Sequence, residues 1–154
     1  MKKAGALVAV SSLPSAYGVG DFGPQAYEYI DILAQMKLKI WQVLPLNPLG
    51  YGNSPYQPYS SFAGDDIYIS VDKLVADGLL NQSDAVEFKS NATIVDYGAV
   101  RSHKTNMLQT AFANFMTNSQ LKAELEAFVA KTSWAYNYAV FVTLKKANHH
   151  KAWN

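Results

Sequence analysis

Two short, nearly continuous apolar runs stand in the first third of the chain, at residues 4–10 and 40–46. A run without polar alternation predicts a strand that is buried on both faces, as in a parallel sheet. Between the runs, apolar residues recur at helical spacing from Ala26 to about Met36, after Pro24, which suits the first position of a helix. This order predicts a β-α-β unit with a right-handed crossover.

Later in the chain the spacing of apolar residues changes, first to that of a strand and then to that of helices. Residues 67–71 alternate between apolar and polar side chains, which predicts a third, half-exposed strand. Asp72 is placed to cap a short helix that runs to Ala76 and is closed by Gly78. The remaining sequence has a helical period, and we expect Asp96 to cap one of its helices.

Two more helices are predicted after the one at Asp96, the first around residues 121–129 and the second capped by Ser133. The strands therefore fall in about residues 1–71 and the mostly helical part in about residues 72–154. Two parallel strands and one crossover helix do not complete a sheet. We therefore expect the whole chain, 1–154, to be an α/β portion of something larger.

Composition narrows the class of partner. The chain has 154 residues, of which 49% are hydrophobic and 16% charged, with a formal net charge of +1. A protein whose main partner is nucleic acid usually has a strongly basic surface. The nearly neutral net charge does not fit this, so we expect no nucleic-acid partner. No apolar stretch approaches the ~20 residues that a membrane helix needs. There is no cysteine, which fits a reducing compartment, and we expect a cytoplasmic protein.

The loop after the second apolar run has the most distinctive chemistry. Residues 50–64 hold four aromatic residues, three glycines and two prolines among hydroxyl and amide side chains. Flat apolar rings interleaved with neutral hydrogen-bonding groups match a sugar, which has apolar C–H faces and a rim of hydroxyls. In α/β sheets, the loops after the carboxyl ends of the strands form binding sites. The pattern therefore predicts a carbohydrate ligand.

Several blocks closely resemble the N-terminal part of amylomaltase, the 4-α-glucanotransferase family. They are Ser11-Ser12-Leu13-Pro14, the glycine-rich block at residues 17–23, Trp41-Gln42-Val43-Leu44-Pro45-Leu46 and Gly50-Tyr51-Gly52-Asn53-Ser54-Pro55-Tyr56-Gln57. The resemblance covers essentially the whole chain. It implies the N-terminal part of a (β/α)₈ TIM barrel with helical insertions, and so an incomplete barrel, because such a barrel needs about 250 residues.

The resemblance also implies an activity. The family transfers glucosyl or maltooligosyl units between α-1,4-glucans by a retaining mechanism with a carboxylate nucleophile and an acid/base carboxyl group. It uses no cofactor and no metal in the chemistry. Its catalytic carboxylates lie downstream of the region that this chain reaches, so we assign no catalytic residue here and expect the piece to be inactive alone. The expected partners are maltooligosaccharides and the missing C-terminal remainder of the barrel.

Five residues are candidates for substrate binding. Tyr56 matches the family tyrosine that stacks beside the sugar at the cleavage subsite, although a loop aromatic could simply plug the end of the sheet. Ser54 matches a serine that hydrogen-bonds glucan hydroxyls, and its alternative role is in the turn before Pro55. Tyr51 matches a tyrosine of a second, surface groove. Gln57 is a weaker candidate, and Asn47 either lines the cleft or belongs to a turn.

Three positions depart from the family pattern. Ala9 stands where many members carry a histidine, and Asp65 stands where an asparagine is usual. Arg101 falls where the aromatic partner of Tyr51 would be expected, which puts the second groove in doubt. Asp65 and Asp66 do not form a catalytic pair, because neighbours on the predicted strand would point to opposite faces.

Two other interpretations remain open. The chain could be a standalone maltooligosaccharide-binding module that lacks catalysis. It could also be an unrelated small α/β protein whose loop tyrosines are plain surface or core residues.

Overall fold

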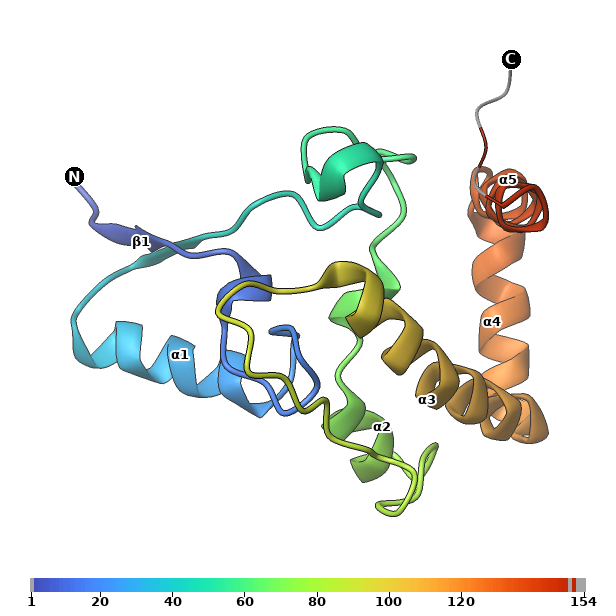
Figure 1. Cartoon of the computed structure of the whole chain (residues 1–154), viewed down its shortest axis with the longest axis horizontal. Coiled ribbons are helices and arrows are strands. Elements are labelled where there is room, and N and C mark those ends of the chain that lie inside the picture. Colours follow the sequence, from blue (N-terminus) through green and yellow to red (C-terminus); the bar gives the residue numbers. More distant parts are fainter. Residues whose placement is uncertain (1, 150, 152–154) are drawn as a thin grey trace.

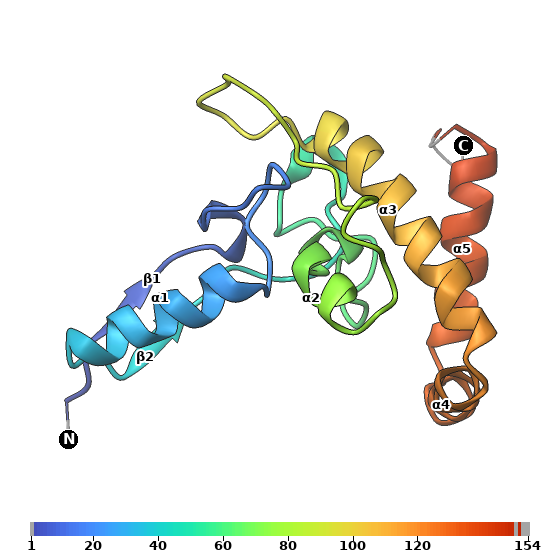
Figure 2. The same cartoon turned by 90° about the horizontal axis from the view of Figure 1, so that it is seen from below.

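A small parallel sheet lies at one end of the molecule, and helices lie at the other (Figure 1). The computed structural model describes residues 2–149 and 151, without the side chain of Tyr51. Strand β1 (Gly5–Leu7) pairs with strand β2 (Ile40–Gln42), with Gly5 opposite Ile40. Helix α1 (Pro24–Gln35) connects them and lies alongside both strands in Figure 2. The predicted β-α-β unit is confirmed.

Both strands are shorter than predicted. In the first apolar run, at residues 4–10, the strand ends at Leu7, and a 3₁₀ helix, η1 (Val10–Ser12), begins at Val10. The second run, at residues 40–46, supplies only β2. Within the described residues each strand has a single neighbour, and the paired segment is three residues long. Backbone hydrogen bonds extend it by one position at each end, from Lys39 to Ala4 and from Val8 to Gln42.

The third strand predicted over residues 67–71 is wrong. The chain there forms the 3₁₀ helix η3 (Asp66–Tyr68) and then helix α2 (Val71–Ala76). The Asp65 side chain accepts a hydrogen bond from the amide of Ile67, and such local bonds compete with a sheet ladder. The cap of α2 is Ser70, two residues before the predicted Asp72, because Val71 is already helical. Gly78, at φ +69°, follows the helix as expected.

The second half of the chain contains three longer helices, α3 (Tyr97–Thr117), α4 (Ser119–Lys131) and α5 (Ala135–Ala147). Asp96 caps α3 through the amide of Ala99, which confirms the prediction. The predicted cap at Ser133 is wrong: Trp134 occupies that position of α5, without a side-chain cap. In both views α4 and α5 stand on the side away from the sheet, and α3 reaches between them and the centre (Figures 1 and 2).

The hydrophobic core lies between the strand ends and α3. Its main cluster combines residues from η1, η3 and α3 with a loop residue, namely Val10, Val19, Ile67, Tyr68 and Val100. Trp41 packs against this cluster, and its indole N–H donates to the carbonyl of Val8 (2.9 Å). None of the helices in the described residues is long and apolar enough to cross a membrane.

Candidate functional site

The aromatic loop, residues 50–64, projects from the segment that follows the carboxyl end of β2. It opens with a 3₁₀ helix, η2 (Tyr51–Asn53), in which Gly52 has φ +69°. Gly50 passes so close to the carbonyl of Gln57 that a Cβ atom there would lie 2.0 Å from that oxygen. Only glycine fits a backbone approach of this kind, so the loop is folded tightly on itself.

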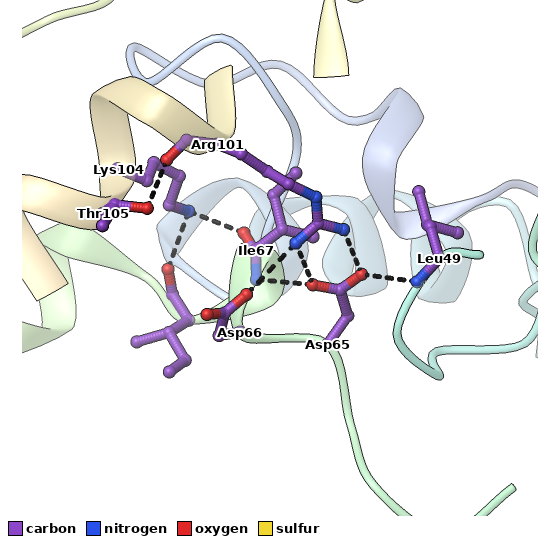
Figure 3. A network of polar contacts seen from close by, with 8 residues as sticks. Leu49, Asp65, Asp66, Ile67, Arg101, Lys104 and Thr105 are labelled. Carbon is purple, nitrogen blue, oxygen red and sulfur yellow. Dashed lines mark hydrogen bonds and ion pairs between the residues drawn. The ribbon is translucent and has the colours of Figure 1, made fainter. Parts of the chain in front are cut away.

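The two ends of the loop, residues 46–49 and 63–67, form its neck and are joined by side-chain and backbone hydrogen bonds. The amide nitrogen of the Asn47 side chain donates to the carbonyl of Ala63 (3.0 Å), and the amide of Asp65 donates to the carbonyl of Leu46 (2.8 Å). The Asp65 carboxylate accepts from the amides of Leu49 and Ile67, both at 3.0 Å. Asp65 therefore joins the segment before the loop to the segment after it (Figure 3).

Arg101 of α3 completes this arrangement. Its guanidinium donates to both carboxylate oxygens of Asp65, at 2.9 and 2.5 Å, and to Asp66 at 3.2 Å (Figure 3). The Asp65 side chain is 1% exposed, whereas that of Asp66 is 69% exposed. The expectation that the two aspartates point apart from one strand is wrong, because they flank the start of η3 and both contact Arg101.

Hydrogen bonds determine the charge state of the Asp65 carboxyl group. Burial by itself would raise the pKa of the Asp65 carboxyl group. The bonds from Arg101 and from the amides of Ile67 and Leu49 outweigh burial and hold this pKa below its usual value. Asp65 is therefore ionised at neutral pH.

A second buried pair lies one helical turn away. Lys104 of α3 is 1% exposed, and its ammonium group donates to the carbonyls of Ile67 (2.7 Å) and Ile69 (2.8 Å). It also lies 3.4 Å from the buried carboxylate of Asp21. Asp21 accepts from the amide of Gly23 as well (2.8 Å), a local turn contact. Burial lowers the pKa of Lys104 and raises that of Asp21, and each partner opposes the shift of the other.

Aromatic contacts attach the far side of the loop to the helices. Phe62 stacks on Trp134, with ring centroids 6.0 Å apart and an interplanar angle of 18°. Tyr59 meets Phe141 of α5 at 6.0 Å and 53°. Two of the loop's aromatic rings are thus engaged by the helical half of the chain. Tyr56 in contrast is 70% exposed.

A small cavity of about 70 Å³ lies where the strands end. It is lined by residues that follow the strands and by residues of η1, the loop, η3 and α3, namely Ala9, Val10, Ser11, Leu44, Leu49, Asn53, Pro55, Tyr68 and Tyr97. A larger one of about 470 Å³, within the usual range of ligand pockets, lies between residues 11–19 and 88–97 and shares Ser11 and Tyr97 with the first. Four serines and one threonine are among the residues that line the larger cavity.

The structure does not gather the predicted binding residues around these cavities. Tyr56 and Gln57 are exposed on the loop, and Ser54 and Asn47 are half-buried. The Ser54 hydroxyl oxygen accepts from the amide of Tyr56 (3.3 Å), a turn contact, and the Asn47 side chain bonds across the neck. The side chain of Tyr51 lies outside the described part of the chain.

Sequence reasoning missed the role of Lys104 and the pairing of Arg101 with Asp65. A signal for Lys104 was present, because residues 100, 104, 107 and 111 follow helical spacing and are all buried. A lysine on the apolar face of a helix indicates a buried partner. Arg101 is the only arginine of the chain, but nothing local points to Asp65, which lies 36 positions away.

Comparison with known proteins decides the family. The sequence model of the 4-alpha-glucanotransferase family matches residues 8–154. The chain belongs to this family. It is 39% identical to a 4-alpha-glucanotransferase of Streptococcus pneumoniae over 99% of its length, and 38% identical to one of Thermus thermophilus over 97%. A chloroplastic/amyloplastic 4-alpha-glucanotransferase of Solanum tuberosum is 32% identical over 99% of this chain.

Among solved structures, the amylomaltase from Streptococcus agalactiae in complex with acarbose superposes with a TM-score of 0.91 and 32% identity, over 98% of this chain. The backbone of this member of the 4-alpha-glucanotransferase family is therefore that of an amylomaltase segment. The chain spans about 30% of the length of the bacterial relatives and 31% of the solved amylomaltase.

Proposed function

We propose that this chain forms the N-terminal portion of the (β/α)₈ catalytic domain of a 4-alpha-glucanotransferase, as one unit over residues 1–154. The observation that carries the proposal is the superposition on an amylomaltase solved with acarbose, at a TM-score of 0.91 over nearly the whole chain. Active sites of such barrels lie at the carboxyl ends of the strands. The aromatic loop follows β2 at that end.

In this proposal the loop binds α-1,4-glucan. The exposed ring of Tyr56 stacks on the apolar face of a glucose unit at the cleavage subsite, and Ser54 and Gln57 bond to sugar hydroxyls. Asn47 positions the neck of the loop at the edge of the cleft. The role of Tyr51 in a second surface groove stays a prediction, and Arg101, at its expected partner's position, is engaged by Asp65 instead.

The chemistry is completed by the part of the relatives that this chain does not span. A carboxylate nucleophile there attacks the anomeric carbon while an acid/base carboxyl group protonates the departing glucan oxygen, which gives a glycosyl-enzyme. The acid/base group, now a carboxylate, then takes the proton of the acceptor's 4-hydroxyl as that oxygen attacks the anomeric carbon and releases the nucleophile. No cofactor or metal ion enters these steps. We therefore expect residues 1–154 to be inactive when they are alone.

The partner that completes the chain is the remainder of the barrel. Each strand has one neighbour within the described residues, and Leu7 (58%) and Ile40 (47%) are exposed at the sheet. Unpaired edges of a parallel sheet are normally covered. Strands of the remainder would pair with these edges. The cytoplasmic location expected from the cysteine-free sequence also stays a prediction, which cell fractionation would test.

A chimeric enzyme tests the proposal. Residues 1–154 replace the matching segment of the Streptococcus agalactiae amylomaltase, and glucose release from maltotriose is measured. Transfer of a maltosyl unit from one maltotriose to another releases one glucose, so we expect glucose together with a longer maltooligosaccharide. A chimera that is folded by circular dichroism but releases no glucose would refute the proposal.

Two tyrosines of equal exposure provide a matched comparison within this chimera. Tyr56 in the loop and Tyr136 on α5 are both 70% exposed. We expect Tyr56→Ala to lower kcat/KM by about 10- to 100-fold, because removing an aromatic contact of about 1.5–3 kcal/mol has that effect. Tyr136→Ala should change kcat/KM less than twofold. Equal effects of the two changes would exclude a special role for Tyr56.

The chain by itself tests the alternative of a non-catalytic binding module. Isothermal titration of the 154-residue chain with maltoheptaose would give measurable heat if the loop binds glucan without the rest of the barrel. Binding by the isolated chain, combined with an inactive chimera, would favour the binding module over the transferase.

A further inference from the structure

The ion pair between Arg101 and Asp65 spans the neck of the aromatic loop. Asp65 makes four hydrogen bonds through one carboxylate: two from Arg101, one from the amide of Leu49 and one from the amide of Ile67. Leu49 immediately precedes the loop and Ile67 follows it. One buried side chain therefore fixes both ends of a 15-residue excursion of the chain, at residues 50–64 (Figure 3).

The guanidinium has a geometry that suits this position. Its planar fork donates to the two carboxylate oxygens through two separate nitrogens, whereas a lysine ammonium has a single nitrogen and no fixed fork. Arg101 also contacts Asp66, so it reaches two successive residues at the start of η3. The contact therefore sets the direction of the carboxylate as well as its charge.

Helix α3 holds Arg101 firmly against the loop. One turn further along the same helix face, Lys104 binds the carbonyls of Ile67 and Ile69. Adjacent turns of α3 thus bind the Asp65 carboxylate, through Arg101, and the backbone that follows it, through Lys104. The segment from Asp65 to Ile69 therefore cannot move away from α3 without breaking contacts to both cations.

We propose that Arg101 is a positioning residue for glucan binding, which acts by orienting Asp65 and thereby the loop that carries Tyr56. This inference rests on the proposed function. Arg101 itself need not touch sugar. Its loss would leave the Asp65 carboxylate buried without a cation, and the neck would rearrange to hydrate it.

Combining Arg101→Gln with Tyr56→Ala distinguishes a positioning role of Arg101 from a general contribution of Arg101 to stability. In the chimeric enzyme, Arg101→Gln should lower kcat/KM for maltotriose by about tenfold or more, since displacements near 1 Å can cost up to a hundredfold. In the Tyr56→Ala background the same change should cost less than about twofold, because the ring that Arg101 helps to place is absent. Asp65→Asn should behave like Arg101→Gln, and the two together should be no worse than the more damaging single change.

Conservative and distant changes serve as controls. Arg101→Lys keeps the charge but loses the two-pronged contact, so it should recover only part of the activity. Lys122→Gln removes an exposed cation from α4 and should leave kcat/KM unchanged. Each variant is assayed well below its own Tm, so that a fraction of unfolded enzyme does not enter the comparison.

The single arginine allows a second measurement on the 154-residue chain. In a ¹⁵N-labelled sample its guanidinium gives one set of signals, which should show slowed exchange with water. Asp65→Asn should reduce this protection, with the contact to Asp66 left in place.

The possible results distinguish a failure of the positioning role from a failure of the proposed function. An active chimera in which Arg101→Gln costs the same with and without Tyr56 would overturn the positioning role and leave the proposed function standing. Arginine signals that are unaffected by Asp65→Asn would overturn it as well. A folded but inactive wild-type chimera would overturn both.

Discussion

Removing the buried cation at Lys104 should be among the most damaging single changes in this chain. In Lys104→Met a side chain of similar length replaces the ammonium group, so packing is largely kept while three contacts are lost. The carbonyls of Ile67 and Ile69 lose donors at 2.7 and 2.8 Å. The carboxylate of Asp21, itself 4% exposed, loses its cation at 3.4 Å.

The expected loss follows from these contacts. Hydrogen bonds to charged groups contribute about 1.5–3 kcal/mol each, and breaking a buried pair by removing one partner costs about 3–5 kcal/mol. The ion pair is long, so the two short carbonyl contacts carry most of the effect. We expect a decrease of about 3–5 kcal/mol in the free energy of unfolding, a large share of the 5–15 kcal/mol that is typical of a domain.

Urea-induced unfolding followed by circular dichroism measures this decrease. Lys122→Met, which removes an exposed lysine from α4, is the matched control and should lie within about 0.5 kcal/mol of wild type. Adding Asp21→Asn to Lys104→Met removes the orphaned charge. The double variant should therefore be less destabilised than the sum of the single changes, by about 0.5–3 kcal/mol. A Lys104→Met protein within about 1 kcal/mol of wild type, or strict additivity, would refute this reasoning.

Three further predictions concern the loop and the pH limits of the fold. Because the pKa of Asp65 is held below its usual value, its contribution to stability is present at neutral pH and is lost as pH falls through the folded-state value. The difference in unfolding free energy between wild type and Asp65→Asn should accordingly shrink on acidification, and a constant difference would contradict the assignment. Burial and the hydrogen bond to Asp72 raise the pKa of Tyr17 to about 12. Stability should fall as pH rises from about 10 towards that value, and urea titrations at alkaline pH should find a shallower fall in Tyr17→Phe. Gly50→Ala should lower Tm by several degrees and weaken maltoheptaose binding, because its Cβ would meet the Gln57 carbonyl, whereas Gly64→Ala, with open space around it, should do neither.

Local patterns in the sequence predicted the parts of the fold that local interactions specify. The β-α-β unit follows from two apolar runs and a helical period, and Asp96 caps α3 as its position indicated. The prediction over residues 67–71 failed although the alternation was real. There the side chains of Asp65 and Ser70 bond to nearby backbone amides and favour helical turns over a strand.

The strand lengths failed for a different reason. An apolar run records how buried a segment is in the complete fold, but a strand is defined by its pairing partners. Within the described residues β1 and β2 pair only with each other, over three residues, and the rest of each apolar run has no strand beside it.

The sequence by itself determined the family, the order of the first elements and the chemistry of the aromatic loop, because these reside in contiguous motifs. Tertiary structure alone decided how that loop is held. The pairs Arg101–Asp65 and Lys104–Asp21 join residues 36 and 83 positions apart. Such contacts arise only when α3 packs across the strand ends, because opposite charges so distant in the chain are brought within hydrogen-bonding distance by packing and not by any local periodicity.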